Sequence, residues 1–137
     1  MFNLERFIIA QKDSYSIALE EIKRGRKNSH WIWYIFPQID GLGFSSMSKF
    51  YAIKSFDEAK AYCENNFLNN NLREITTELF KHDESATTIL GNIDAKKVCS
   101  CMTLFDLVSP NDIYAEVLNK FYEGKRCHRT LNFIKMR

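Results

Sequence analysis

Apolar residues recur along most of this 137-residue chain every three to four positions, the spacing of amphipathic helices, rather than at every second position as in half-buried strands. Only two prolines, Pro37 and Pro110, interrupt the chain. This pattern predicts an all-α fold. We expect a single compact domain over residues 1–137, with about eight short helices around a central hydrophobic helix.

The first 25 residues predict two helices. Asn3 stands before an apolar stripe that begins at Leu4, and we expect it to cap the first helix. Asp13-Ser14 has the character of a second helix start, and the stripe then continues until Gly25, a typical residue after a helix end. The alternative is one kinked helix over the same residues.

Serines placed directly before apolar-periodic segments predict the starts of later helices. Ser45 or Ser46 begins one short helix, Ser55 begins another, and Ser85 begins a third. The asparagine run at 69–71 either breaks the pattern or starts the amphipathic helix that follows it.

A predicted helix over residues 95–108 is apolar on nearly every side. Its apolar positions are Val98, Cys99, Cys101, Met102, Leu104, Phe105, Leu107 and Val108. A helix with so little polar surface is typical of the centre of a protein. We expect Asp94 to cap this helix and Pro110 to open the next one, so that the remaining helices surround it.

The stretch 29–38 has an unusual density of aromatic residues. It contains both tryptophans, a histidine, a tyrosine and a phenylalanine within ten residues, and a basic run at 23–27 precedes it. Ser29 can cap a short helix over residues 30–36. Pro37 limits that helix, because the residue before a proline is driven away from helical conformation.

One side of this predicted helix carries groups that could take part in chemistry. His30, Trp33 and Tyr34 lie within about 100° of one another. The opposite, apolar face consists of Ile32, Ile35 and Phe36. Lys27 comes just before the helix N-terminus, where free N–H groups and the helix dipole favour anions, so a phosphate-bearing or nucleotide-like ligand is expected. His30 is the candidate catalytic acid–base or phosphate-contacting residue. The alternative is that it only hydrogen-bonds within the fold.

The predicted hydrophobic helix carries one polar stripe. Lys96, Ser100 and Thr103 are spaced i, i+4 and i+7, and Lys97 lies beside them. Buried hydroxyls must be hydrogen-bonded, either back to their own helix or into a pocket. If the stripe faces His30, the two halves form one site. The predicted ligand-binding residues are then Lys27, Trp33, Tyr34, Gln38, Lys97, Ser100 and Thr103.

Other classes of function have less support in the residues. Cys99 and Cys101 have the wrong spacing for a zinc knuckle and point about 200° apart on a helix, so we predict neither a metal site nor a cofactor. A nucleophilic role for Ser100 or Cys101 lacks an identifiable base. The net charge of +2 is too small to imply a nucleic-acid partner by itself. The basic run at 23–27 could touch nucleic acid, but Asp13, Glu20 and Glu21 lie on the preceding helix, so we expect a solvated face instead. The main alternative to a ligand pocket is a protein–protein interaction module without a catalytic site.

The sequence also gives an expectation for location. Glu5 and Arg6 interrupt the apolar N-terminus, and no apolar run approaches the roughly 18 residues typical of a membrane helix. Four cysteines without an export signal predict reduced thiols. We therefore expect a cytoplasmic protein with no membrane span.

The aromatic stretch reads Ser29-His30-Trp31-x-Trp33-x-x-Phe36-Pro37-Gln38 and is followed by Gly41-Leu42-Gly43. This motif resembles a bacterial domain-of-unknown-function family whose members are often labelled "calpastatin". The similarity continues to Met102-Thr103-Leu104-Phe105 and Thr130-Leu131, and so covers essentially the whole chain. It implies a single all-helical domain in a cytoplasmic bacterial protein, and it implies no activity. Cys101 and Cys127 depart from the family pattern, which has a serine and an acidic residue at these positions.

Overall fold

The computed structural model describes residues 2–135, and these form nine α-helices. The helices are α1 (Glu5–Arg24), α2 (Ile32–Ile35), α3 (Ser46–Tyr51), α4 (Phe56–Glu64), α5 (Asn66–Phe80), α6 (Ala86–Leu90), α7 (Asn92–Val108), α8 (Ile113–Tyr122) and α9 (His128–Lys135). Over the described residues no strand forms, although an isolated β-bridge pairs Ile39 with Ile53. The predicted all-α class is confirmed, and the nine helices of residues 2–135 agree with the expected number of about eight.

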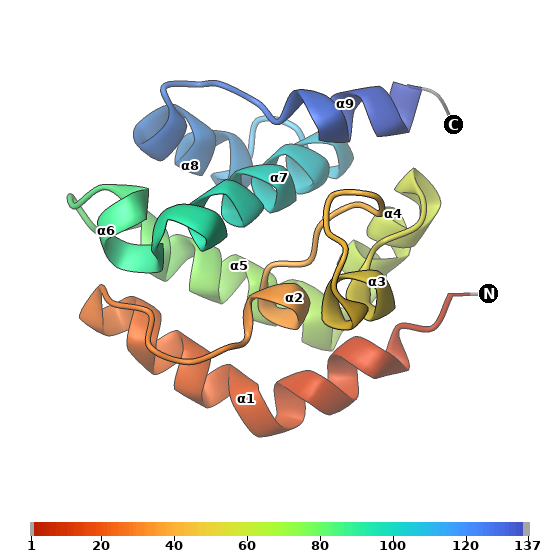
Figure 1. The fold of residues 1–137 in the computed structure, drawn as a ribbon, viewed down its shortest axis with the longest axis horizontal. Helices are drawn as coiled ribbons and strands as arrows, with labels where there is room; N and C mark the ends of the chain where they lie inside the picture. The colour runs from red at the N-terminus through yellow and green to blue at the C-terminus, as the bar shows by residue number, and fades with distance from the viewer. Residues whose placement is uncertain (1, 136–137) are drawn as a thin grey trace.

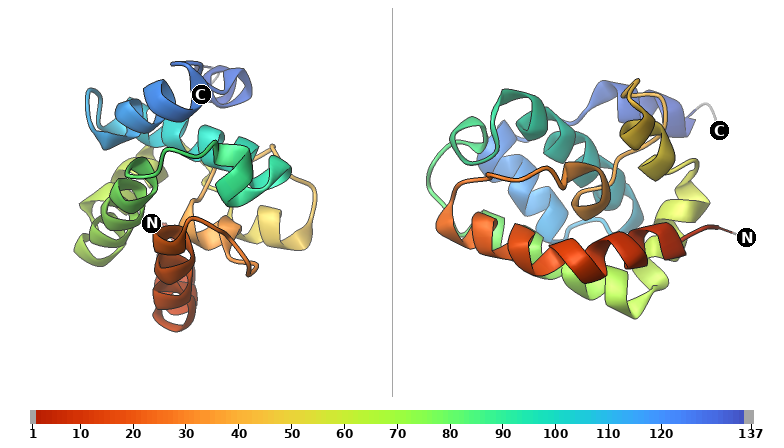
Figure 2. Two further views of the ribbon diagram at one scale, coloured as in Figure 1. Left: turned by 90° about the vertical axis from the view of Figure 1, so that its left-hand side faces the viewer. Right: turned by 60° about the horizontal axis from the view of Figure 1, so that its bottom comes forward.

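Helix α7 occupies the centre of the arrangement, since it packs against α4, α6, α8 and α9. In Figure 1, α1 runs along the bottom of the molecule, α8 and α9 lie along the top, and α7 crosses between them. The left view of Figure 2 likewise places α1 at the bottom and the α8–α9 pair at the top. No helix of residues 2–135 combines the length and apolar character needed to cross a membrane.

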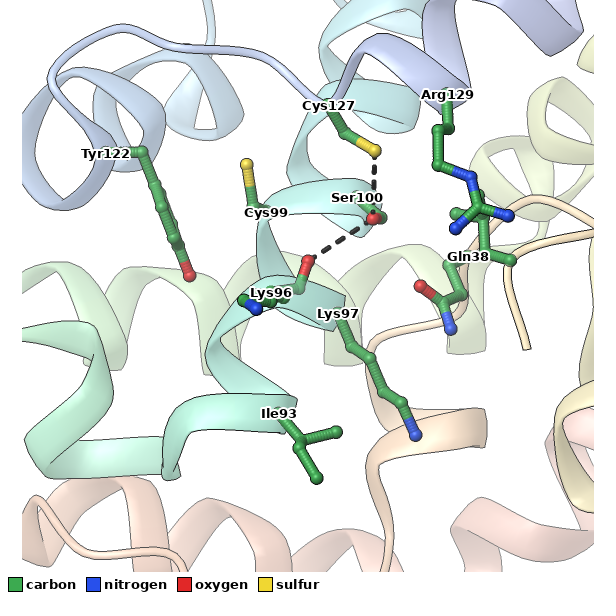
Figure 3. Close-up of a pocket in the computed structure, with 10 residues that line it drawn as sticks. Gln38, Ile93, Lys96, Lys97, Cys99, Ser100, Tyr122, Cys127 and Arg129 are labelled. Atoms are coloured by element: carbon green, nitrogen blue, oxygen red, sulfur yellow. Dashed lines mark hydrogen bonds between the residues drawn. The ribbon is translucent and has the colours of Figure 1, made fainter. Parts of the chain in front are cut away.

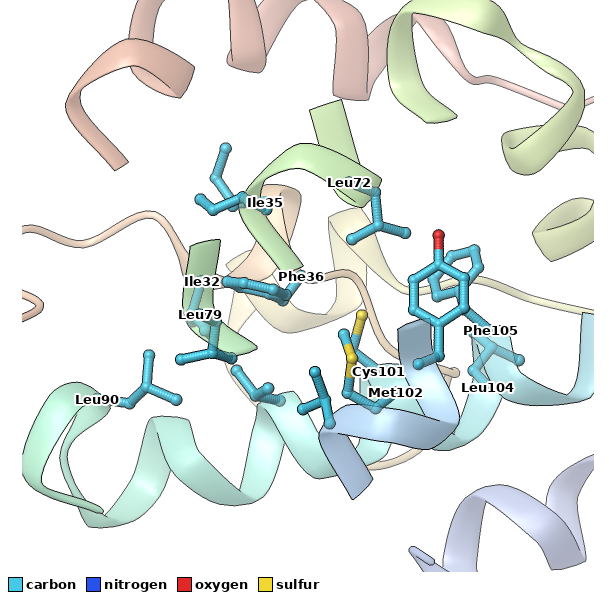
Figure 4. Packing of buried hydrophobic residues seen from close by; sticks show 14 of the residues in the cluster. Ile32, Ile35, Phe36, Leu72, Leu79, Leu90, Cys101, Met102, Leu104 and Phe105 are labelled. Atoms are coloured by element: carbon cyan, nitrogen blue, oxygen red, sulfur yellow. The ribbon is translucent and has the colours of Figure 1, made fainter. Parts of the chain in front are cut away.

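The hydrophobic effect explains the central position of α7. Its fully buried apolar residues are Val98, Cys101, Met102, Leu104 and Phe105. They share one core cluster with Ile32, Ile35 and Phe36, the predicted apolar face of the aromatic stretch (Figure 4). Burying each large apolar side chain stabilises a fold by roughly 1.5–3 kcal/mol. The central hydrophobic helix and this apolar face are therefore both confirmed.

Residues 5–24 form one helix, so the predicted second start at Asp13-Ser14 is wrong. Asp13 is exposed to water, and the stripe that packs against α5 continues past it without interruption. Asn3 does not cap this helix, because Leu4 takes the N-cap position and no side chain caps it. Gly25 does end the helix, with a φ of 79° that residues other than glycine rarely adopt.

The helix predicted over 30–36 is shorter in the structure, where α2 covers Ile32–Ile35. Ser29 does not cap it, because its hydroxyl donates to the Glu21 carboxylate instead, at 2.6 Å. Trp31 takes the N-cap position with a non-helical φ of −140°. A tertiary partner on α1 thus removes the predicted cap and shortens the helix.

Serine capping is confirmed at three helices. Ser45, Ser55 and Ser85 each accept a hydrogen bond from the backbone N–H three residues later, at the starts of α3, α4 and α6. Helix α5 starts earlier than expected, because Asn65 caps it. The asparagine run at 69–71 therefore lies inside a helix.

The two helices after Gly91 also begin at other residues than predicted. Helix α7 starts at Asn92, so Asp94 lies in its first turn and is not the cap. Its carboxylate instead forms an ion pair with Lys27, at 2.8 Å. Helix α8 begins directly after Asp112, whose carboxylate accepts the Ile113 N–H at 2.7 Å. Pro110 therefore lies before the helix and is not its first residue.

The Glu21 carboxylate fixes the loop between α1 and α2. It accepts the backbone N–H groups of Asn28 (2.7 Å) and Ser29 (2.9 Å), the Ser29 hydroxyl, and the Trp31 indole N–H (3.0 Å). The residue is only 2% exposed. Burial raises the pKa of Glu21, but these hydrogen bonds outweigh burial and lower the pKa to about 2. The charged form of Glu21 is thus the form that stabilises the fold.

We expect Glu21→Gln to lower the free energy of unfolding by about 2–3 kcal/mol near neutral pH, because an amide group carries no charge and presents N–H groups to donors. A carboxylate with a lowered pKa stabilises the folded state above its unfolded pKa of about 4.3, and this contribution disappears as pH falls toward about 2. Urea unfolding of both proteins between about pH 6 and pH 3 should show their difference shrinking with acid. A difference that stays constant over this range would contradict the assignment.

Candidate functional site

A pocket of about 470 Å³ lies along one side of α7 (Figure 3). Its walls come from the loop after α2, from α7, from the end of α8 and from the start of α9. The lining residues are Gln38, Leu42, Ile93, Lys96, Lys97, Cys99, Ser100, Tyr122, Cys127 and Arg129. The end of α8 and the start of α9 form one continuous stretch, so three stretches of the chain, 38–42, 93–100 and 122–129, build one concave site.

The outer wall of the pocket is held in place by backbone contacts. The Ile53 N–H donates to the Gln38 carbonyl (2.9 Å), and the Asp40 N–H donates to the Ile53 carbonyl (2.8 Å). These bonds fix the segment that carries Gln38 and Leu42. The Arg129 guanidinium donates across to the Gly41 carbonyl at 3.2 Å, which joins the start of α9 to this loop.

The charge of the pocket is positive. Lys96, Lys97 and Arg129 line it, and no aspartate or glutamate does. The ammonium group of Lys97 lies 5.4 Å from the centre of the Trp33 ring, a cation–π arrangement that orients the side chain. Because no carboxylate in the pocket lining neutralises these three cations, the electrostatic potential of the site favours an anionic ligand.

Ser100 and Cys127 connect α7 to the start of α9. The Ser100 hydroxyl lies 3.2 Å from the Cys127 Sγ and 3.2 Å from the Lys96 carbonyl, and it can donate to either. Thr103 is fully buried beneath them. Its hydroxyl donates to the Cys99 carbonyl (2.8 Å) and accepts the Cys127 N–H (3.0 Å). Both hydroxyls thus hold the thiol of Cys127 at the pocket wall.

The four cysteines differ in acidity. Burial raises the pKa of Cys127, but hydrogen bonds from Ser100 and from the backbone N–H groups of Thr130 and Arg129 outweigh it and lower the pKa. Burial raises the pKa of Cys63 to about 11, and it also raises the pKa of Cys99 and of Cys101. Cys127 therefore has the most acidic thiol of the chain.

Three of the predicted ligand-binding residues line this pocket, namely Gln38, Lys97 and Ser100. Trp33 is half-buried and adjoins the site through Lys97. Ser100 contacts Cys127 as well as its own helix, so the polar stripe of α7 does face a pocket. Their role in ligand binding stays a prediction.

The other predicted site residues lie elsewhere. Lys27 pairs with Asp94 and lies 4.8 Å from the centre of the Trp31 ring, so its charge is engaged within the fold. Tyr34 packs against Tyr51, with ring centres 5.1 Å apart. His30, the candidate catalytic residue, is exposed and does not line the pocket.

Thr103 belongs beneath the pocket rather than in its lining. It donates back to the residue four positions earlier, which was the structural alternative for the stripe. The condition that would have joined this stripe to His30 in one site is not met in the pocket lining, since His30 lies in the loop before α2 and outside the pocket. Over residues 2–135 no group of three or more metal-ligating side chains comes together.

Sequence reasoning missed the contribution of the C-terminal segment. Tyr122, Cys127 and Arg129 reach the pocket from the end of α8 and the start of α9. The Tyr122 hydroxyl donates to the Ala95 carbonyl at 2.5 Å and so ties this segment to α7. No local pattern indicates such an approach, although Arg126, Arg129 and Lys125 mark the segment as basic.

Nearly the whole chain is similar to a known protein family and to a solved structure. The sequence profile of a family described as "Protein of unknown function (DUF1810)" matches residues 1–134. The crystal structure of the conserved hypothetical protein Rv1873 from Mycobacterium tuberculosis is similar, with a TM-score of 0.95 and 38% sequence identity over 98% of this chain and 97% of that chain. Among curated proteins, none matches. These descriptions name no ligand and no reaction.

We expect Thr103→Val to lower the free energy of unfolding by about 1–3 kcal/mol, because the part-buried Cys127 N–H loses its acceptor on the fully buried Thr103. Thr77→Val is the matched control. Thr77 makes the same bond back to its own helix but is exposed, so its loss should cost less than about 0.5 kcal/mol. Urea unfolding measures both. Equal destabilisation by the two variants would show that the bond to Cys127 does not matter.

Proposed function

Because the chain belongs to the family described as "Protein of unknown function (DUF1810)", we propose a function from the chemistry of its own pocket. The pocket beside α7 binds a small anionic molecule, and the class of ligand that we propose is phosphate-bearing or nucleotide-like. The proposal concerns binding and assigns no reaction.

The observation that carries the proposal is the set of three cations without a carboxylate. Lys96 and Lys97 project from adjacent positions of α7, and Arg129 comes from the facing start of α9. Arginine matches the geometry of phosphate oxygens through paired N–H donors, and lysine supplies a point charge. A ligand with two or three negative oxygens can contact both walls.

The remaining lining supports an organic ligand rather than a bare ion. The volume of about 470 Å³ lies within the usual range of roughly 300–1,000 Å³ for small-molecule sites. Gln38 and Ser100 offer polar groups, while Leu42 and Ile93 offer apolar contact. Ile93 is 71% exposed, so an apolar part of the ligand would remove its side chain from water.

His30 receives no role in this proposal, because it lies outside the pocket lining. We further propose a cytoplasmic location. Four free cysteines support it, since thiols stay reduced there.

A second candidate function, a protein-interaction module, is favoured by a different observation. Phe44, in the loop before α3, is 83% exposed, and Phe50, in α3 itself, is 56% exposed. Phe50 also lines a shallow groove with Phe2. Exposed aromatic side chains gathered in one region are typical of contact surfaces.

A thermal-shift titration with inorganic phosphate and nucleoside mono-, di- and triphosphates tests the pocket. A ligand at about a hundred times its dissociation constant stabilises a protein by about 2.7 kcal/mol. We expect Lys97→Gln to weaken the effect at least about tenfold in apparent affinity, because it removes a pocket cation. Sodium chloride at matched ionic strength separates specific binding from screening.

Lys60→Gln is the control for this experiment, since Lys60 is an exposed lysine of α4 that does not line the pocket. It removes the same charge at a distance and should leave the titration unchanged. Equal weakening by both variants would mean a general charge effect. Unmoved melting temperatures with every anion would leave the interaction module as the better candidate.

A further inference from the structure

We propose that Cys127 is a modification site, whose thiolate forms a mixed disulfide with a small anionic disulfide held by the cations of the pocket. The inference rests on the proposed function, since Lys96, Lys97 and Arg129 would hold the anionic groups of this co-reactant. It adds a covalent step and a class of substrate to that site.

The position of Cys127 gives its sulfur an unusual environment. The residue directly precedes α9, and its carbonyl accepts the Leu131 N–H at 3.1 Å, which places it at the helix N-cap. The free N–H groups of a helix start stabilise a negative sulfur. In Figure 3 the Cys127 sulfur points at Ser100 and into the space that Lys97 and Arg129 border.

Ser100 supplies a second stabilising contact. Its hydroxyl lies 3.2 Å from Sγ, and the residue is only 6% exposed, so little water competes for this bond. A hydroxyl donor stabilises a thiolate more than a thiol, and the lowered pKa of Cys127 agrees with this arrangement. Two independent parts of the fold, α7 and the start of α9, therefore converge on one sulfur.

The other cysteines provide the contrast that makes the site specific. Cys101 is fully buried, and Cys63 does not line the pocket. Cys99 lines the pocket, but its thiol donates to the Lys125 carbonyl at 3.8 Å, and burial raises its pKa. Of the two cysteines that line the pocket, only Cys127 therefore has a thiol with a lowered pKa.

The reaction is thiol–disulfide exchange. The Cys127 thiol releases its proton to solvent, and the thiolate attacks one sulfur of the small disulfide. A new S–S bond forms to Sγ while the S–S bond of the reagent breaks. The departing half leaves with the electron pair as a thiolate and takes a proton from solvent. Cys127 is oxidised and the departing half is reduced, so no further oxidant is needed.

Charge selects the co-reactant. A disulfide of small carboxylate-bearing peptides presents several negative oxygens, which match the same three cations as a phosphate does. We use glutathione disulfide as the anionic probe and bis(2-hydroxyethyl) disulfide as the neutral probe. The comparison separates intrinsic thiol reactivity from capture by the pocket.

The test is the rate of mixed-disulfide formation at neutral pH, followed by intact-protein mass spectrometry, with peptide mapping to locate the modified cysteine. We expect Cys127 to react at least about tenfold faster than Cys63 with either probe. Glutathione disulfide should react faster than the neutral probe once their intrinsic reactivities toward a free cysteine peptide are divided out.

Variants assign the two contributions. Lys97→Gln should slow the reaction of Cys127 with glutathione disulfide several-fold more than it slows the reaction with the neutral probe. Ser100→Ala should slow both probes, because it removes the donor to Sγ. Cys127→Ser should abolish the fast reaction while Cys63→Ser retains it, and serine at a helix N-cap preserves the fold.

Some results would overturn the inference. Fast modification of Cys99, or reaction of Cys127 no faster than Cys63, removes Cys127 as the site. Equal corrected rates for both probes, or equal slowing of both by Lys97→Gln, removes the anionic co-reactant. Cys127→Ser keeps Lys96, Lys97 and Arg129, so its thermal shift with phosphate compounds still tests the proposed function separately.

Discussion

The buried carboxylate of Glu21 is the interaction on which the first third of this fold depends. A buried charge without partners costs several kcal/mol, and four donors from one loop compensate for that cost here. The same bonds turn the Trp31 indole into the core and set where α2 begins. The apolar face of α2 then joins the core cluster that includes the buried residues of α7, and the loop after α2 reaches the pocket with Gln38.

Periodicity alone predicted the fold class, the central helix and the apolar face of the aromatic stretch, because burial of apolar side chains decides all three. Helix starts were predicted well at Ser45, Ser55 and Ser85, where the serine has only its own helix to bond. Helix starts were predicted poorly where a charged residue from another part of the chain binds the side chain that was expected to cap the helix. Ser29 bonds Glu21 and Asp94 bonds Lys27, so neither caps the expected helix.

The candidate site follows the same division. Lys97 and Ser100 could be predicted, because a polar stripe on an otherwise apolar helix needs partners. Arg129 and Cys127 could not, since their approach depends on how the chain returns over α7 after α8. Thr103 shows the limit of the stripe argument. Its hydroxyl finds both a donor and an acceptor within the fold and leaves nothing for a ligand.

The attachment of α9 has a consequence for local opening of the chain. Thr130 is the fully buried residue of this helix, and segments with little buried surface open at lower free energy than the whole domain. Arg129 of α9 and Lys97 of α7 both line the pocket, one on each of the two helices. A molecule bound between them adds its binding free energy to the cost of that opening. If a ligand occupies the pocket, the C-terminal helix should therefore detach less often and be less accessible to proteases.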